Sequence, residues 1–270
     1  MASKRTITLP APADPLPQTE TAQRFLDSAV ASVRNTIEAM DTLREVRREK
    51  EGKGRSGRLA DSDMDLLRMA IVFAGAGIDA TLKRLVLDAI PDLAEVSPQV
   101  AAKFRDFVDR TLAPGGENAA GHRTLVNVLL SDAASPRAAL LELYIGELVG
   151  NSLQSAEELD NICGALGISD QALRKRIADA KGPRSGPAGK TRLRQLFQAR
   201  NEIVHELDLQ VPGEANQRRR RPRAIKETID SVREGLETAQ LIINEVSVLL
   251  TAPKTDQAGA PPRAGRRPKG

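Results

Sequence analysis

The sequence predicts an all-α protein: a bundle of long antiparallel helices with shorter inserted helices and disordered N- and C-terminal tails. Apolar residues recur three and four positions apart over long stretches, as they do on one face of an α-helix. Leu, Ala, Arg and Glu, which favour helices, dominate the composition. No stretch alternates apolar and polar residues as a half-buried strand would, and the sequence contains no internal repeat.

One helical domain accounts for most of the chain. The 270 residues, 40% of them hydrophobic, suffice for one sizeable core, which we expect over residues 19–250 with an insert at 155–180. Residues 1–18 contain four prolines and no periodicity, so we expect an extended or disordered arm. Residues 251–270 carry five basic residues against one acid, a balance equal to the formal net charge of +4, and we expect a basic disordered tail.

Two long helices are expected first. The helix over 19–50 keeps one face apolar, and glycines at 52, 54 and 57 follow it. One of the residues 61–63 can cap the second helix. We expect this helix to run to Ile90 and to end at Pro91, because proline removes a helical hydrogen bond.

Shorter helices follow. The pattern predicts helices over 98–112, 125–130 and 138–153. Two further short helices are expected on either side of Gly167, with Ser155 and Ser169 as their N-caps.

The second of these short helices is basic. It carries Arg174, Lys175 and Arg176, and its spacing from Cys163 and Gly167 resembles a helix-turn-helix with a basic recognition helix. A helix-turn-helix DNA-binding regulator is therefore one functional alternative. Two packed helices with a solvated basic face explain the same pattern equally well.

A helix over 190–209 carries the most informative pattern. Arg200 falls in the middle of its apolar stripe, where a permanent charge must meet a carboxylate, a phosphate or water. Asn201 and His205 lie on the adjoining polar face. The apolar stripe consists of Leu193, Leu196, Phe197, Val204 and Leu207.

The segment Arg200-Asn201-Glu202-Ile203-Val204-His205 resembles the R-x4-6-H signature of the HEPN superfamily of ribonucleases, and its flanks resemble the RiboL-PSP type of HEPN domain. The resemblance implies a HEPN-like bundle and a metal-independent endoribonuclease. In such an enzyme Arg200 would bind the phosphate, His205 would transfer protons, and Asn201 would orient the phosphate. The resemblance also implies a homodimer with a composite active site, a role as a toxin or in anti-phage defence, and an antitoxin or defence-system partner.

Asp79 and Lys83 are candidates for supporting the motif. In HEPN domains a polar or acidic position on an earlier core helix commonly supports the motif arginine, and Asp79 is our candidate for holding Arg200. An ordinary surface pair between Asp79 and Lys83, four residues apart, explains the pattern equally well. If Asp79 instead neutralises Arg200 in the core, the chain is a non-catalytic HEPN-like module that binds RNA or protein.

A group of loop arginines follows the motif helix. Residues 212–223 are polar and contain Arg218, Arg219, Arg220, Arg221 and Arg223. Arginines directly after an RNA-cutting helix would track phosphates, each contact adding salt-dependent affinity. Solvated loop charge is the alternative.

The chemistry of RNA suits this residue set. RNA carries its own nucleophile, the 2′-OH, so a histidine that titrates near neutral pH and a guanidinium that binds phosphate oxygens suffice without a metal. The products would be a 2′,3′-cyclic phosphate and a 5′-OH. Residues five apart on a helix differ by about 140° in direction, so Arg200 and His205 of one chain do not point the same way. The dimer implied by the resemblance resolves this difficulty, because two chains supply two of each residue.

Other functional classes receive little support from the sequence. Two distant histidines and one cysteine predict no metal site, and no nucleotide-binding loop or cofactor motif is present. An aromatic content of 2% argues against a stacking platform for single strands. The single cysteine, with no signal peptide and no long apolar run, predicts a cytoplasmic protein without a membrane partner.

Overall fold

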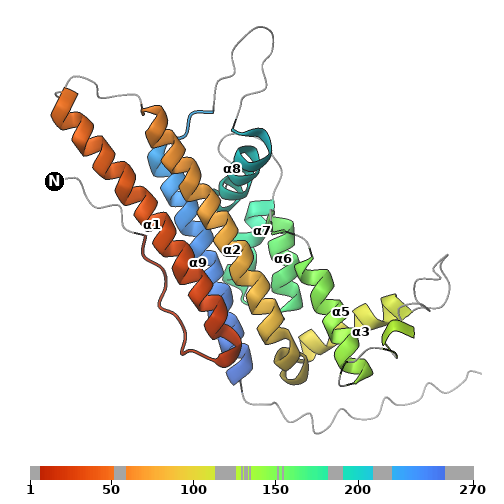
Figure 1. The fold of residues 1–270 in the computed structure, drawn as a ribbon. Helices are drawn as coiled ribbons and strands as arrows, with labels where there is room; N and C mark the ends of the chain where they lie inside the picture. Colours follow the sequence, from red (N-terminus) through yellow and green to blue (C-terminus); the bar gives the residue numbers. More distant parts are fainter. Residues whose placement is uncertain are drawn as a thin grey trace, which may run out of the picture.

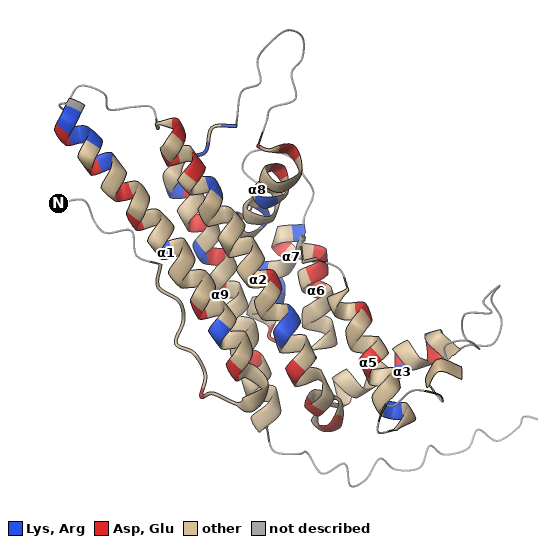
Figure 2. Ribbon diagram, in the orientation of Figure 1, with Lys and Arg blue, Asp and Glu red and all other residues tan. Residues whose placement is uncertain are grey.

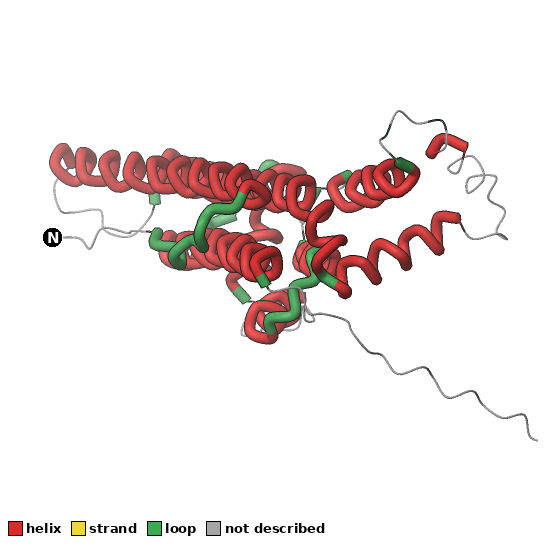
Figure 3. The backbone as a smooth tube through the Cα atoms, turned by 90° about the horizontal axis from the view of Figure 1, so that it is seen from below, coloured by secondary structure: helices red, strands yellow, loops and turns green. Residues whose placement is uncertain are grey.

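The computed structural model describes residues 7–51, 59–112, 126–128, 130, 133, 135–150, 152–153, 155–181, 191–208 and 221–252. All regular secondary structure in these ranges is helical, which confirms the all-α prediction (Figures 1 and 3). None of the described helices combines the length and the apolar character that a membrane span requires.

Three long helices, α1 (Pro17–Glu51), α2 (Asp61–Val96) and α9 (Ile225–Thr251), form the main bundle (Figure 1). The first two run antiparallel, because Arg47 near the end of α1 pairs with Asp63 near the start of α2. Small residues let these two helices approach closely: a Cβ at Gly77 would lie 2.1 Å from the Cβ of Ala29. The core lies where the three helices meet, around Leu26, Ile78 and Leu236.

The shorter helices are α3 (Pro98–Leu112), α5 (Pro136–Val149), α6 (Ala156–Ala165), α7 (Gln171–Lys181) and α8 (Arg192–Glu206). Of these, α3, α5 and α8 pack on α2, while α6 and α7 pack on each other and on α8. Tyr144 of α5 joins α3 through Phe104 and Phe107, with ring centroids 5.8 Å and 5.2 Å apart. Helix α8 lies against both α2 and α9, so the motif helix is seated on the main bundle.

The N-caps of α6 and α7 correct one prediction. Ser155 accepts a hydrogen bond from the backbone N–H of Glu158 at 3.2 Å, as predicted. For α7, however, Asp170 rather than Ser169 takes this role and accepts from the N–H of Leu173 at 2.6 Å. Gly167 has a φ of +73°, which lets the chain turn between the two helices.

Helix α2 does not end at Pro91, so that prediction is wrong. The helix continues to Val96 and closes at Ser97, whose N–H donates to the carbonyl of Leu93 at 2.8 Å. Proline removes one hydrogen bond, but Ile90 and Leu93 on either side of it are completely buried, and their packing holds the last turns in place.

Of the two forms expected for residues 1–18, extended or disordered, the described residues 7–16 take the extended one against the bundle, and Pro17 begins α1. Ile7 is only 1% exposed, and its carbonyl accepts a hydrogen bond from Arg34 of α1 at 3.2 Å. Asn244 of α9 receives the N–H of Ala13 and donates to the carbonyl of Ala11, both at 2.9 Å. The proline-rich segment is extended, as expected, but α1 and α9 satisfy its backbone and bury its apolar side chains. Of the predicted basic tail, residues 253–270 lie outside the described residues.

Candidate active site

Helix α8 carries the predicted motif. It begins after Thr191, whose hydroxyl accepts from the N–H of Arg194 at 3.4 Å, and it ends at Glu206, three residues before the predicted end. Leu193, Leu196 and Phe197 are buried as predicted. The stripe does not extend to Val204 and Leu207, whose side chains are 45% and 72% exposed.

Arg200 lies across α2. Its aliphatic stem rests on Gly75, where a Cβ would come within 2.9 Å of Arg200 Cγ. Its guanidinium donates from Nη1 to Oδ1 of Asn201 at 3.2 Å. Glycine on α2 therefore makes room for the motif arginine, whose polar contact is a neutral amide on its own helix.

Asp79 does not hold Arg200, so this prediction is wrong. One carboxylate oxygen of Asp79 accepts the backbone N–H of Leu153 at 2.7 Å, and the other pairs with Lys83 at 3.1 Å. Asp79 lies one helical turn beyond Gly75, and the segment that enters α6 takes up its carboxylate. Among the described residues, no carboxylate forms an ion pair with Arg200.

Asn201 and His205 lie on one side of α8 at i and i+4, as their spacing predicts. His205 is exposed and Asn201 is half-buried. Arg200 points toward α2, about 140° from His205. Within one chain, therefore, Arg200 and His205 point in different directions from α8.

A buried ion cluster follows the motif helix, and the sequence reasoning missed it. We call Arg68, Asp208 and Arg223 the Asp208 cluster. Asp208 is fully buried, and its carboxylate receives Nε of Arg68 at 2.6 Å and Nε of Arg223 at 3.1 Å. Its backbone N–H donates to the carbonyl of Glu202 at 2.9 Å. Arg68, a charge at the start of the long apolar stretch of α2, was the signal that could have pointed to a buried acid.

The backbone conformation at the end of α8 depends on this cluster. Leu207 and Asp208 have φ values of 51° and 57°, in the left-handed region that non-glycine residues seldom adopt. The two arginines that bind the Asp208 side chain hold this conformation in place. The cluster therefore fixes the chain three residues after His205.

Two of the predicted RNA-binding arginines are engaged by acids of this region. Arg221 pairs with Glu206 at 2.8 Å and with Glu202 at 3.5 Å, and its hydrogen bond to Glu206 raises its pKa. Arg223 pairs with Glu202 at 3.2 Å in addition to Asp208. Arg218, Arg219 and Arg220 lie outside the described residues.

The basic helix α7 is largely neutralised within the protein. Arg174 pairs with Asp160 of α6 at 2.8 Å, and Arg176 lies 3.8 Å from Glu237 of α9. Lys175 is exposed. Two of the three side chains that suggested a DNA-reading helix thus have acidic partners in the same chain.

Comparison with protein-family models, with curated proteins and with solved structures finds no match for this chain. In the part of the chain that the structure describes, no group of three or more His, Cys, Asp and Glu side chains could hold a metal ion.

Proposed function

We propose that this protein is a metal-independent endoribonuclease of the HEPN type, with Arg200 and His205 as its catalytic residues. The observation that carries the proposal is the state of Arg200. A half-buried guanidinium held by an amide, with no carboxylate of the described residues paired to it, retains its charge for an anionic ligand. The RNA phosphate is such a ligand.

The roles follow from chemistry. Arg200 binds the scissile phosphate and stabilises the charge that develops on it, while His205 moves the proton of the 2′-OH or of the leaving 5′-oxygen. Asn201, which already contacts Arg200, orients the guanidinium. The products carry 2′,3′-cyclic phosphate and 5′-OH ends.

A homodimer would bring the two residue types together. Residues 69–78 of α2 contain no Lys, Arg, Asp or Glu, and α2 is drawn without charge there in Figure 2. Met69 and Phe73 of this stretch are exposed, as are Val204 and Leu207 of α8. Exposed apolar side chains on α2 and α8 favour association with a second copy. The arginine of one chain would then approach the histidine of its partner.

The two alternatives have less support. A binding module built on an Asp79–Arg200 pair lacks that pair. A DNA-binding regulator would need Arg174 and Arg176 to leave their acidic partners. A role as a toxin or in anti-phage defence, with RNA as the substrate, is the biology we propose with this activity.

The proposal is tested with a mixed RNA pool in EDTA. Purified wild type is expected to cut the pool and to leave cyclic-phosphate ends. Arg200→Ala and His205→Ala, checked for wild-type helicity, are expected to lose this cleavage by roughly 100-fold or more. Cleavage by His205→Ala at the wild-type rate would overturn the assignment.

A further inference from the structure

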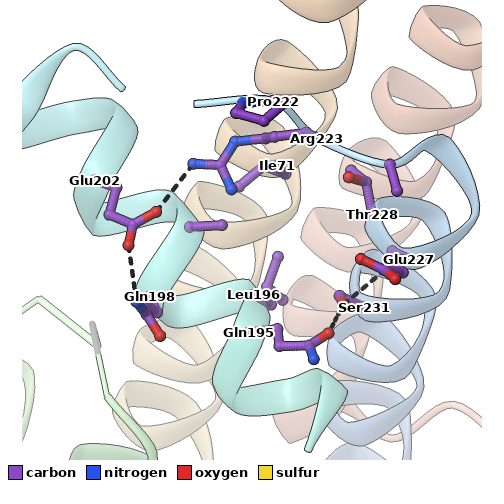
Figure 4. Close-up of a pocket in the computed structure, with 12 residues that line it drawn as sticks. Ile71, Gln195, Leu196, Gln198, Glu202, Pro222, Arg223, Glu227, Thr228 and Ser231 are labelled. Carbon is purple, nitrogen blue, oxygen red and sulfur yellow. Dashed lines mark hydrogen bonds and ion pairs between the residues drawn. The ribbon is translucent and has the colours of Figure 1, made fainter. Parts of the chain in front are cut away.

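A polar pocket lies on the other flank of α8 from Arg200. It has a volume of about 250 Å³, and it opens between α8, the start of α9 and residues 222–224 (Figure 4). Gln198 and Glu202 of α8 and Thr228 of α9 line its walls, while Ile71 and Leu196 provide an apolar floor. This volume accommodates one planar ring system rather than a whole nucleotide.

Thr228 supplies a hydrogen-bonding group inside this pocket. The residue is only 8% exposed, and it lines the pocket at the first turn of α9. A hydroxyl in a pocket wall can donate one hydrogen bond to a ligand and accept others from it. The hydroxyl of Ser231 in the same wall already contacts Gln195 and the carbonyl of Glu227.

The charges of the pocket define the ligand. Glu202 and Glu227 bring two carboxylates and Arg223 brings one guanidinium, so the lining carries a net negative charge, which disfavours a phosphate or another anion. Glu202 also binds Arg223, but no hydrogen bond or ion pair engages the exposed carboxylate of Glu227 among the described residues. The pocket therefore offers acceptors to a neutral ligand that presents donors.

We propose that this pocket binds a guanine base of the RNA and so selects the cleavage site. Among the four RNA bases, guanine presents N1–H and N2–H side by side, which one carboxylate can accept together. Glu227 would accept these two donors, and the hydroxyl of Thr228 would donate to O6 or N7. The faces of the ring would lie on Ile71 and Leu196, because the pocket has no aromatic lining.

The pocket adjoins the catalytic stripe. Gln198 and Glu202 precede Asn201 and His205 by three residues each, so the two sets are neighbours on the surface of α8. A nucleotide whose base enters the pocket would thus present its sugar and phosphate beside His205. The inference rests on the proposed ribonuclease function, which it deepens by naming the base that is read.

The test measures base binding without cleavage. Full-length protein is titrated with guanosine, inosine, adenosine, cytidine and uridine, and the methyl NMR signals of Ile71 and Leu196 report occupancy. Guanosine is expected to shift these signals most. Inosine, which lacks the 2-amino group, is expected to bind about tenfold more weakly because one hydrogen bond is lost.

Variants separate the pocket from the fold. Thr228→Val keeps the shape of the side chain, and Glu227→Gln keeps its size; both are expected to weaken guanosine binding about tenfold. Thr238→Val is the matched control, because Thr238 is a buried threonine of the same helix whose hydroxyl bonds to the carbonyl of Glu234. This control is expected to bind guanosine like wild type.

The outcomes distinguish the two proposals. If wild type cuts RNA but no nucleoside shifts the two methyl signals, or if all five nucleosides shift them equally, the guanine pocket is overturned and the nuclease stands. If guanosine binds and both variants weaken it while wild type cuts no RNA, the pocket stands and the ribonuclease proposal fails.

Discussion

The Asp208 cluster predicts a large stability loss from the removal of a single charge. Asp208→Asn is the sharpest substitution there, since asparagine keeps the shape of the side chain and tolerates the left-handed backbone at φ 57°. It removes the negative charge that Arg68 and Arg223 share. Both arginines would remain in place, largely withdrawn from water.

The magnitude follows from the contacts that survive. Breaking a buried ion pair by removing one partner costs roughly 3–5 kcal/mol. Arg68 keeps Asp65 at 3.0 Å and the carbonyl of Arg221 at 3.3 Å, and Arg223 keeps Glu202 at 3.2 Å. We therefore expect Asp208→Asn to lower the free energy of unfolding by about 2–3 kcal/mol, below the full cost of an unpaired charge.

Urea denaturation followed by circular dichroism measures this loss. Asp65→Asn is the matched control: Asp65 also pairs with Arg68, but its side chain is 51% exposed, so we expect a loss below about 1 kcal/mol. In the double variant Arg68→Met/Asp208→Asn the loss should be smaller than the sum of the two single losses. A loss below about 0.5 kcal/mol for Asp208→Asn would refute the reasoning, because a buried pair of this geometry cannot be that weak when broken.

Three further predictions concern the motif arginine, the aromatic cluster and the exposed face. Gly75→Ala places a Cβ 2.9 Å from Arg200 Cγ, so Arg200 must shift. We expect this variant to cleave RNA about tenfold more slowly or worse, because the arginine is misplaced. Its free energy of unfolding, measured by urea denaturation, should change by about 1 kcal/mol or less. Burial, aided by Glu147, raises the pKa of Tyr144 from 10.0 to about 12. Ionisation is therefore harder in the folded state, so wild type should lose about 2 kcal/mol of stability relative to Tyr144→Phe as pH rises from 10 to 12, measured by urea unfolding. Phe73→Glu should convert a dimer to a monomer in light scattering, because it buries a charge at the proposed interface.

Each of these predictions has its own control. Gly146→Ala, whose Cβ would meet nothing within 4 Å, should cut RNA like wild type, and equal rates for Gly75→Ala and Gly146→Ala would contradict the placement of Arg200. If the free energies of unfolding of wild type and Tyr144→Phe change equally with pH above pH 10, the burial argument is contradicted. A wild-type protein that is monomeric, or a Phe73→Glu variant that remains dimeric, would contradict the proposed interface.

The helices could be predicted from the sequence because their patterns are local. The long apolar periodicities placed α1 and α8 within three residues of their observed bounds, and most errors arose where distant contacts decide. Pro91 stays inside α2 because buried neighbours outweigh its missing hydrogen bond.

The candidate site was predictable only in part. The spacing of Asn201 and His205 gives their shared face of α8 directly. The partner of Arg200 could not be derived, because it depends on which residue of α2 lies opposite and on the Leu153 N–H that occupies Asp79. Asp208 looked like one more polar residue at a helix end. Its role emerges only from the tertiary approach of Arg68, 140 positions away in the sequence.

The most direct test of the central claim uses one RNA strand that wild type cuts and a copy with a single 2′-deoxyribose at the mapped cleavage position. Both strands are incubated in EDTA with wild type and with His205→Ala. We predict that wild type cuts only the all-ribose strand and that His205→Ala cuts it roughly 100-fold more slowly or not at all. Cleavage of the 2′-deoxy strand by wild type, or equal rates for the two proteins on the ribose strand, would contradict the mechanism.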